Sequence, residues 1–234
     1  MTEEVDFETY LSVTKNKFQI FLFDKKNFKN IYKNELEFKN KFNFIEFNNL
    51  SKFLDNNIFK IEKLSGSFIK NIFLIIEHDE NLYVDICVKK KNYDDLINQK
   101  DLKNILSEVK DLFKENYQEQ NILHMIVNNY LINGQKYSTF TSGLKGDHLC
   151  LEVNFVSISN DVMISFDKVL ENYQIKVSKY FSEHYVKNFF NEDNMELSKM
   201  AHKLKNGYNH NEVILIPKNI ENKGFFEKFF QLFS

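Results

Sequence analysis

The chain has 234 residues, of which 43% are hydrophobic and 27% are charged, and these proportions are typical of a globular protein with a buried core. It has 31 lysines, no arginine and 33 acidic residues, which give a net charge of -2. Because nucleic-acid binders usually carry a basic excess with arginine, we expect no nucleic-acid partner. The acidic stretch 1–16 is not a signal peptide. No apolar run approaches the roughly 20 residues that cross a bilayer, so any membrane contact would lie on the surface.

Hydrophobic periodicity predicts the elements of the first half of the chain. Two short apolar strands form a hairpin over 18–38. Apolar residues at helical spacing predict a helix over 48–64. Two further strands are expected at 68–76 and 82–88, on either side of a turn. A long amphipathic helix is expected over 94–117.

The second half of the chain continues with alternating strands and helices. A strand over 122–132 ends in the turn Asn133–Gly134, and a loop at 141–146 leads into a strand over 149–158. A helix over 160–173 is expected to be capped near Asn160. The remaining expected elements are a short apolar run at 175–177, helices at 181–190 and 195–204, a strand at 213–216 and a linker at 218–223.

This order mixes strands and helices without regular alternation. For the middle of the chain, about 66–175, it therefore predicts an α+β fold in which helices cover one face of a small mixed sheet. Cys87 and Cys150 lie in apolar, strand-like runs. We interpret them as two buried thiols in a reducing compartment.

The last dozen residues, KGFFEKFFQLFS, form an amphipathic pattern. At 100° per residue the aromatic and aliphatic side chains fall within one arc, and this face either docks on the protein's own core or lies on a membrane. Six such residues, half-immersed, would contribute about 5–8 kcal/mol before the helix is ordered. This is a weak anchor that needs several copies. The expected membrane-binding residues are Phe225, Phe226, Phe229, Phe230, Leu232, Phe233, Lys223 and Lys228.

Two central segments resemble a known family. Asn121–Gln135 (NILHMIVNNYLINGQ) and Ser142–Phe155 (SGLKGDHLCLEVNF) are similar to consecutive segments of FtsA, the actin-like bacterial cell-division protein. The tail resembles the C-terminal membrane-targeting helix of that family. The matching residues are Ile122, Leu123, His124, Tyr130, Gly134, Gln135, Gly143, Gly146 and Leu151.

The resemblance implies a division of the chain into four parts. Residues 66–180 correspond to the inserted interaction subdomain of FtsA, called 1C, which serves contacts between FtsA molecules and recruits later division proteins. Residues 1–65 correspond to a remnant of the actin-like subdomain 1A. Helices and a short strand at 181–217 pack back on the body, and 218–234 form the linker and the membrane-targeting helix.

The chain also departs from the family. Val127 stands where proline is common, and Asn133 stands where aspartate is common. The nucleotide-binding half is missing, and Asp24 is followed by no glycine that would let backbone amides approach a phosphate. ATP binding is therefore not carried over. The part of FtsA that binds the FtsZ tail lies in the same missing half, so direct FtsZ binding is not carried over either.

The sequence contains no recognisable catalytic or metal site. The six histidines are scattered without metal-ligand spacing. Gly143 and Gly146 form a GxxG loop that either cradles a phosphate or simply turns the chain. The basic run Lys89–Lys91 is either solvated surface or a contact for lipid headgroups. We expect no cofactor, no metal and no enzymatic activity.

The sequence therefore predicts a non-catalytic, FtsA-like adaptor on the cytoplasmic face of the bacterial inner membrane, at midcell. Its partners would be other division proteins or further copies of itself, bound through edge strands and the loop 138–148. Two alternatives remain open: a divergent actin-like ATPase, or a scaffold of another envelope assembly such as a pilus system.

Overall fold

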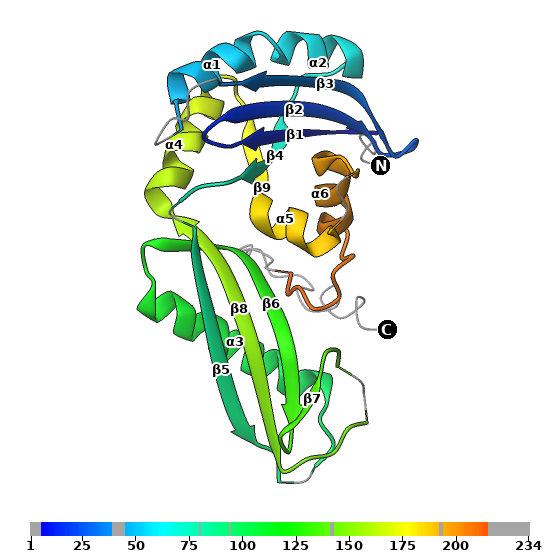
Figure 1. The fold of residues 1–234 in the computed structure, drawn as a ribbon, viewed down its shortest axis with the longest axis vertical. Helices are drawn as coiled ribbons and strands as arrows, with labels where there is room; N and C mark the ends of the chain where they lie inside the picture. The colour runs from blue at the N-terminus through cyan, green and yellow to red at the C-terminus, as the bar shows by residue number, and fades with distance from the viewer. Residues whose placement is uncertain are drawn as a thin grey trace, which may run out of the picture. The chain divides into compact units, whose positions relative to one another are not determined.

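The computed structural model describes residues 6–38, 45–79, 81–93, 95–140, 143–191 and 194–214. Two compact units make up the chain (Figure 1). The first combines Met1–Asn81 with Ser159–Asn206, and the second combines Leu82–Ile158 with Gly207–Ser234. Most of the second unit is therefore inserted between two halves of the first. Each unit has its own sheet and helices, which confirms the predicted α+β class.

The first unit is built on a five-stranded sheet with the strand order β3-β2-β1-β4-β9. β1, β2 and β3 form an antiparallel meander, and β4 and β9 run parallel to β1. The central strands are buried along most of their length, as expected for strands covered on both faces. The strands are β1 (Phe7–Val13), β2 (Lys17–Asp24), β3 (Lys29–Glu37), β4 (Asn71–Ile76) and β9 (Lys176–Ser182).

Helices cover both faces of this first sheet (Figure 1). On one face Phe18 of β2 contacts Phe53 of α1, with ring centroids 6.0 Å apart. On the other face Tyr10 and Phe21 belong to a core shared with α5 and α6. Coverage on one face only was predicted for the small sheet in the middle of the chain, not for this sheet. The first face carries α1 (Phe47–Asp55), α2 (Ile58–Ser65) and α4 (Asn160–Glu171), and the second carries α5 (Glu183–Phe190) and α6 (Leu197–Lys205).

A buried asparagine divides the helix that was predicted over 48–64. Asn57 is fully buried, and its side chain donates to the carbonyl of Phe53 at 2.6 Å. Its Oδ1 accepts hydrogen bonds from the hydroxyl of Tyr32 at 2.6 Å and from Nδ2 of Asn34 at 2.7 Å. These bonds attach the turn between α1 and α2 to β3, so the chain forms two helices where periodicity predicts one.

The second unit is a four-stranded sheet, in the order β5-β8-β6-β7, with one long helix on its inner face. Buried side chains of the helix meet those of the strands, and the rings of Phe113 and Phe155 stack 4.6 Å apart. A capping box between Asn98 and Asp101 starts the helix, five residues after the predicted position. The elements are β5 (Leu82–Lys91), α3 (Gln99–Asn116), β6 (Gln120–Ile132), β7 (Gln135–Tyr137) and β8 (His148–Ser159).

The two units cut the chain at different places from the predicted segments 1–65, 66–180, 181–217 and 218–234. Within 66–180, the strands β4 and β9 and the helix α4 belong to the first unit. The reason is that β4 pairs with β1 and β9 pairs with β4. Hydrophobic periodicity did not reveal β1, so it could not show that these strands share a sheet. The described residues 207–214 belong to the second unit and not to the unit that contains α5 and α6.

Candidate functional site

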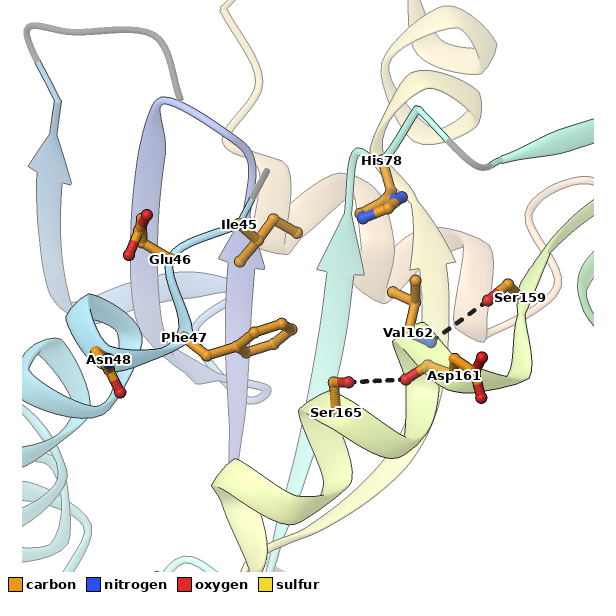
Figure 2. Close-up of a pocket in the computed structure, with 9 residues that line it drawn as sticks. All are labelled: Ile45, Glu46, Phe47, Asn48, His78, Ser159, Asp161, Val162 and Ser165. Atoms are coloured by element: carbon orange, nitrogen blue, oxygen red, sulfur yellow. Dashed lines mark hydrogen bonds between the residues drawn. The ribbon is translucent and has the colours of Figure 1, made fainter. Parts of the chain in front are cut away.

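A cleft of about 450 Å³ opens in the first unit beyond the carboxyl end of β4. Figure 2 shows Ile45 and Phe47 on one wall, and His78 and Val162 on the other. Ligands of proteins with parallel sheets commonly bind beyond the carboxyl ends of the strands, so this cleft is the candidate ligand site of the first unit. The remaining lining residues are Glu46, Asn48, Ser159, Asp161 and Ser165.

The first turn of α4 forms one side of this cleft. Ser159 caps the helix by accepting a hydrogen bond from the amide of Val162, where the sequence predicted a cap near Asn160. The hydroxyl of Ser165 donates to the carbonyl of Asp161 at 2.8 Å (Figure 2). The hydroxyls of Ser159 and Ser165 are therefore engaged in hydrogen bonds to the backbone of α4. The carboxylates of Glu46 and Asp161 oppose the binding of an anion such as a phosphate.

Glycine is scarce in the first unit, where a phosphate-binding loop would be needed. Gly66 is the only glycine in 1–81 and 159–206. Asp24, which was considered as part of a phosphate loop, closes the turn between β2 and β3. Its carboxylate accepts hydrogen bonds from the side chain and the amide of Asn27 and from the amide of Lys26, and these bonds lower its pKa. Asp24 is thus a turn residue.

A cluster of charged and polar groups connects β1 to α6 in the first unit. The carboxylate of Glu8 accepts hydrogen bonds from His202 at 2.8 Å and from Tyr10 at 2.6 Å, and it also contacts Lys205. Burial alone would raise the pKa of Glu8, but the bonds from His202, Lys205 and Tyr10 outweigh it and lower this pKa to about 2. Burial and the Glu8 charge raise the pKa of Tyr10. The cluster holds α6 on the sheet and was not predicted.

The outer face of the second sheet places both cysteines away from its core. β5 alternates, with Val84, Ile86 and Val88 packed toward α3 and Cys87 exposed on the other side. Cys150 on β8 is half-buried, and the two sulfurs form a disulfide. The prediction of two buried free thiols is therefore wrong. Alternation along β5 already placed Cys87 on the exposed side, and the pairing of β5 with β8 brings the two residues together.

Most of the residues that resemble FtsA build the core and turns of the second unit. Leu123, Tyr130 and Leu151 are buried, and Ile122 packs against the core. Gly134 has φ +84° beside Asn133 at φ +50°, which is the geometry of a tight hairpin turn between β6 and β7. Gln135 is an exposed residue at the start of β7. The motif therefore specifies a fold rather than a reactive group.

The loop glycines have a steric explanation. A Cβ on Gly146 would lie 2.4 Å from Cγ2 of Ile132, so the close approach of the loop to β6 requires glycine at this position. Gly143 has φ +89°, a conformation that side chains rarely adopt. Among the described residues no group of three His, Cys, Asp or Glu side chains could hold a metal ion. A turn of the chain is therefore enough to explain both glycines of the GxxG loop, without a bound phosphate.

His124 is the one family-motif residue with a charged partner. Its Nδ1 lies 2.9 Å from Oε1 of Glu212, and both side chains are buried. The backbone beside Glu212 bonds to β6 as well, from the Val127 amide to Asn211 and from the Val213 amide to Met125. His124 therefore attaches the segment 209–213 to the second sheet. Sequence spacing could not reveal this pair, since its members lie 88 residues apart.

The predicted membrane-binding residues Lys223, Phe225, Phe226, Lys228, Phe229, Phe230, Leu232 and Phe233 lie outside the described residues. No helix within the part of the chain that the structure describes is long and apolar enough to span a bilayer. Membrane attachment through the tail therefore stays a prediction.

No protein-family model matches the chain, and no curated protein sequence matches it. Among solved structures it is similar to the PilM–PilN type IV pilus biogenesis complex, with 8% identity and a TM-score of 0.48, over 78% of this chain and 49% of that one. It is also similar to the cytoplasmic domain of EpsL, an inner membrane component of the type II secretion system of Vibrio cholerae. That match has 8% identity and a TM-score of 0.34, over 77% of this chain and 57% of that one.

A third similar structure is a protein of unknown function with an actin-like ATPase fold from Bacteroides thetaiotaomicron. Its identity is 12% and its TM-score 0.33, over 80% of this chain and 57% of that one. The chain thus spans about half the length of these structures. Two of the three belong to envelope assemblies, and none of the three is FtsA.

Proposed function

We propose that this protein is a non-catalytic adaptor that makes protein–protein contacts within an assembly on the cytoplasmic face of the bacterial inner membrane. The observation that carries the proposal is the inserted second unit, whose strand β5 lies at the edge of its sheet over ten residues. An edge strand presents backbone donors and acceptors that another strand can bind. An exposed edge of this length is uncommon unless it is used or protected.

The two ends of β5 differ in chemistry. Lys89, Lys90 and Lys91 occupy its last three positions, and lysines on an edge strand hinder pairing with another chain. The preceding residues Leu82–Val88 carry no lysine. Tyr83 is 47% exposed on the outer face there and offers an aromatic contact. A partner strand would therefore pair along Leu82–Val88.

The absence of catalysis is part of the proposal. Gly66 is the only glycine of the first unit, and Asp24 is engaged in its own turn. Nothing in this arrangement offers the flexible backbone that cradles a phosphate. Calorimetric titration of the full chain with Mg-ATP is expected to give no heat of binding. Micromolar binding would instead favour the alternative, a divergent actin-like ATPase.

The assembly we favour is the cell-division machinery, because the segments 121–135 and 142–155 resemble FtsA. In this proposal the tail holds the adaptor at midcell together with further copies or other division proteins. A second candidate is a scaffold of a pilus or secretion system, the class to which two of the similar solved structures belong. A fluorescent fusion in dividing cells separates the two. Midcell bands support the division adaptor, and polar foci or diffuse fluorescence contradict it.

A further inference from the structure

Three large apolar side chains project from α2 and the turn that follows it. Phe59 is 73% exposed, Leu64 is 52% exposed and Phe68 is 81% exposed. They belong to one short stretch of the first unit, 58–70, which runs along α2 and into β4. Solvent exposure of two phenylalanines and a leucine within ten residues costs free energy, so a surface of this kind usually has a use.

The helical geometry of α2 places these groups away from the core. At 100° per residue, Phe59, Lys63, Lys60 and Leu64 fall within an arc of about 140°. Ile61, which is fully buried, lies on the opposite side and packs toward the sheet. Beyond α2, Ile69 is buried while its neighbour Phe68 points outward. The exposed arc is thus a consequence of how α2 docks.

The charge of this stretch is positive. Lys60, Lys63 and Lys70 are exposed within 57–70, where Glu62 is the only acidic residue. The carboxylate of Glu62 turns back and accepts a hydrogen bond from the amide of Ile69 at 3.1 Å. Just before the stretch, Asp55 accepts a hydrogen bond from Tyr173 at 2.7 Å. Three lysines against one glutamate give the stretch 57–70 a net charge of +2.

We propose that Phe59, Leu64 and Phe68, together with Lys60, Lys63 and Lys70, form a membrane-contact surface, here called the α2 patch, that binds anionic lipid bilayers. Phenylalanine and leucine side chains enter the acyl boundary, and lysine side chains keep their apolar stems on the membrane while their charges reach lipid phosphates. Protein interfaces, by contrast, are depleted of lysine at their centre. Interleaved lysines therefore favour a lipid surface over a protein partner.

This inference rests on the proposed membrane location, and it adds a contact that does not depend on the tail. One weak apolar anchor binds a membrane only marginally, and a second basic and apolar contact makes the attachment stable. Each lysine near an anionic surface adds to binding in a salt-dependent way. The α2 patch would give each copy two attachments.

The chain has no tryptophan, so a single introduced tryptophan reports its own surroundings. Phe68→Trp and, separately, Phe59→Trp are placed in the full chain, with Tyr93→Trp as the control. Tyr93 belongs to the second unit and is also 73% exposed. Each variant is mixed with vesicles of phosphatidylcholine and phosphatidylglycerol, and with vesicles of phosphatidylcholine alone. Emission spectra, quenching by brominated lipids and co-sedimentation are measured together.

The α2 patch predicts a blue shift and quenching for Phe59→Trp and Phe68→Trp on anionic vesicles, and neither for Tyr93→Trp. Lys60→Gln with Lys63→Gln is expected to weaken co-sedimentation by roughly tenfold on the same vesicles. Co-sedimentation without any spectral change at either position would overturn the α2 patch and leave the proposed membrane location intact. No co-sedimentation at all would contradict both. A blue shift that needs a partner protein rather than vesicles would assign the surface to that partner and overturn the proposal.

Discussion

The carboxylate of Glu8 on β1 accepts a hydrogen bond from Nδ1 of His202 on α6, at 2.8 Å. The two residues lie 194 positions apart, and with Lys205 they connect the second strand-and-helix part of the first unit to its first strand. The pair joins elements from the two ends of this unit. Because folding lowers the pKa of Glu8, the stability of the unit depends on pH.

Stability is expected to fall in acid through Glu8. The pKa of Glu8 is about 2 in the folded protein against 4.5 ordinarily. A lowered pKa contributes stability that is fully present above about pH 4.5 and is lost as the pH falls toward 2. Glu8→Gln should lower the free energy of unfolding at pH 7 by about 1–2 kcal/mol, after allowance for solvent screening, and should flatten this acid dependence. Urea unfolding at several pH values measures both.

The matched control for Glu8 is Glu115→Gln, an exposed residue near the end of α3. It should leave the acid dependence unchanged. If Glu8→Gln and Glu115→Gln behaved alike, the cluster around His202 would not stabilise the first unit.

Asn57 should be essential for the break between α1 and α2. Asn57→Ala leaves the Tyr32 hydroxyl and the Asn34 side chain without their buried acceptor. An unsatisfied buried polar group costs about 1–3 kcal/mol. Asn56→Ala, at the exposed neighbouring position, should cost less than about 0.5 kcal/mol. Thermal unfolding compares the stability of the two variants. Equal losses of stability would contradict the role given to Asn57.

The buried pair of His124 and Glu212 should hold the segment 209–213 on β6. Removing one member of a buried pair costs about 3–5 kcal/mol, because the other is left unpaired. Glu212→Ala should therefore speed hydrogen exchange of the Val127 and Val213 amides by roughly a hundredfold, since both bond across this junction. His210→Ala, exposed in the same segment, is the control. Unchanged protection in Glu212→Ala would contradict the pair's role.

The cysteines should resist alkylation unless a reductant is present. Cys87 and Cys150 close a loop across 63 residues, and a cross-link of this span stabilises by about 2–4 kcal/mol. Mass spectrometry after denaturation and alkylation counts the free thiols, and none is expected without reductant. Cys150→Ser should lower the unfolding midpoint of the second unit only under oxidising conditions. Two alkylated thiols in protein isolated without reductant would restore the original expectation.

Periodicity predicted the hairpin of β2 and β3, the long helix α3 and the strands β6 and β8, because each carries a strong local pattern. It missed β1, since Glu8, Thr9 and Ser12 interrupt the apolar residues of that strand. Ser12 and Glu8 find their polar partners on α5 and α6, in Glu183 and His202 respectively. Without β1, the pairing of β4 and β9 in the same sheet could not be foreseen.

The candidate contact surfaces were predictable only in part. Alternation along 82–88 indicates a half-exposed strand, yet only the strand order places β5 at the edge of its sheet. The exposure of Phe68 was hidden, because Phe68 starts the strand predicted over 68–76, whereas β4 begins only at Asn71. The buried turn at Asn57 sets the orientation of α2 and therefore decides which side chains face outward.

The central claim, an adaptor that binds a partner along β5, is tested most directly by photocrosslinking in living cells. A photoreactive residue replaces Tyr83 on β5, and the same residue at exposed Asp111 on α3 serves as the control. The account predicts an adduct from position 83 that contains a second copy of this chain or another division protein, and none from position 111. The same background at both positions, or adducts only with pilus or secretion components, would contradict it.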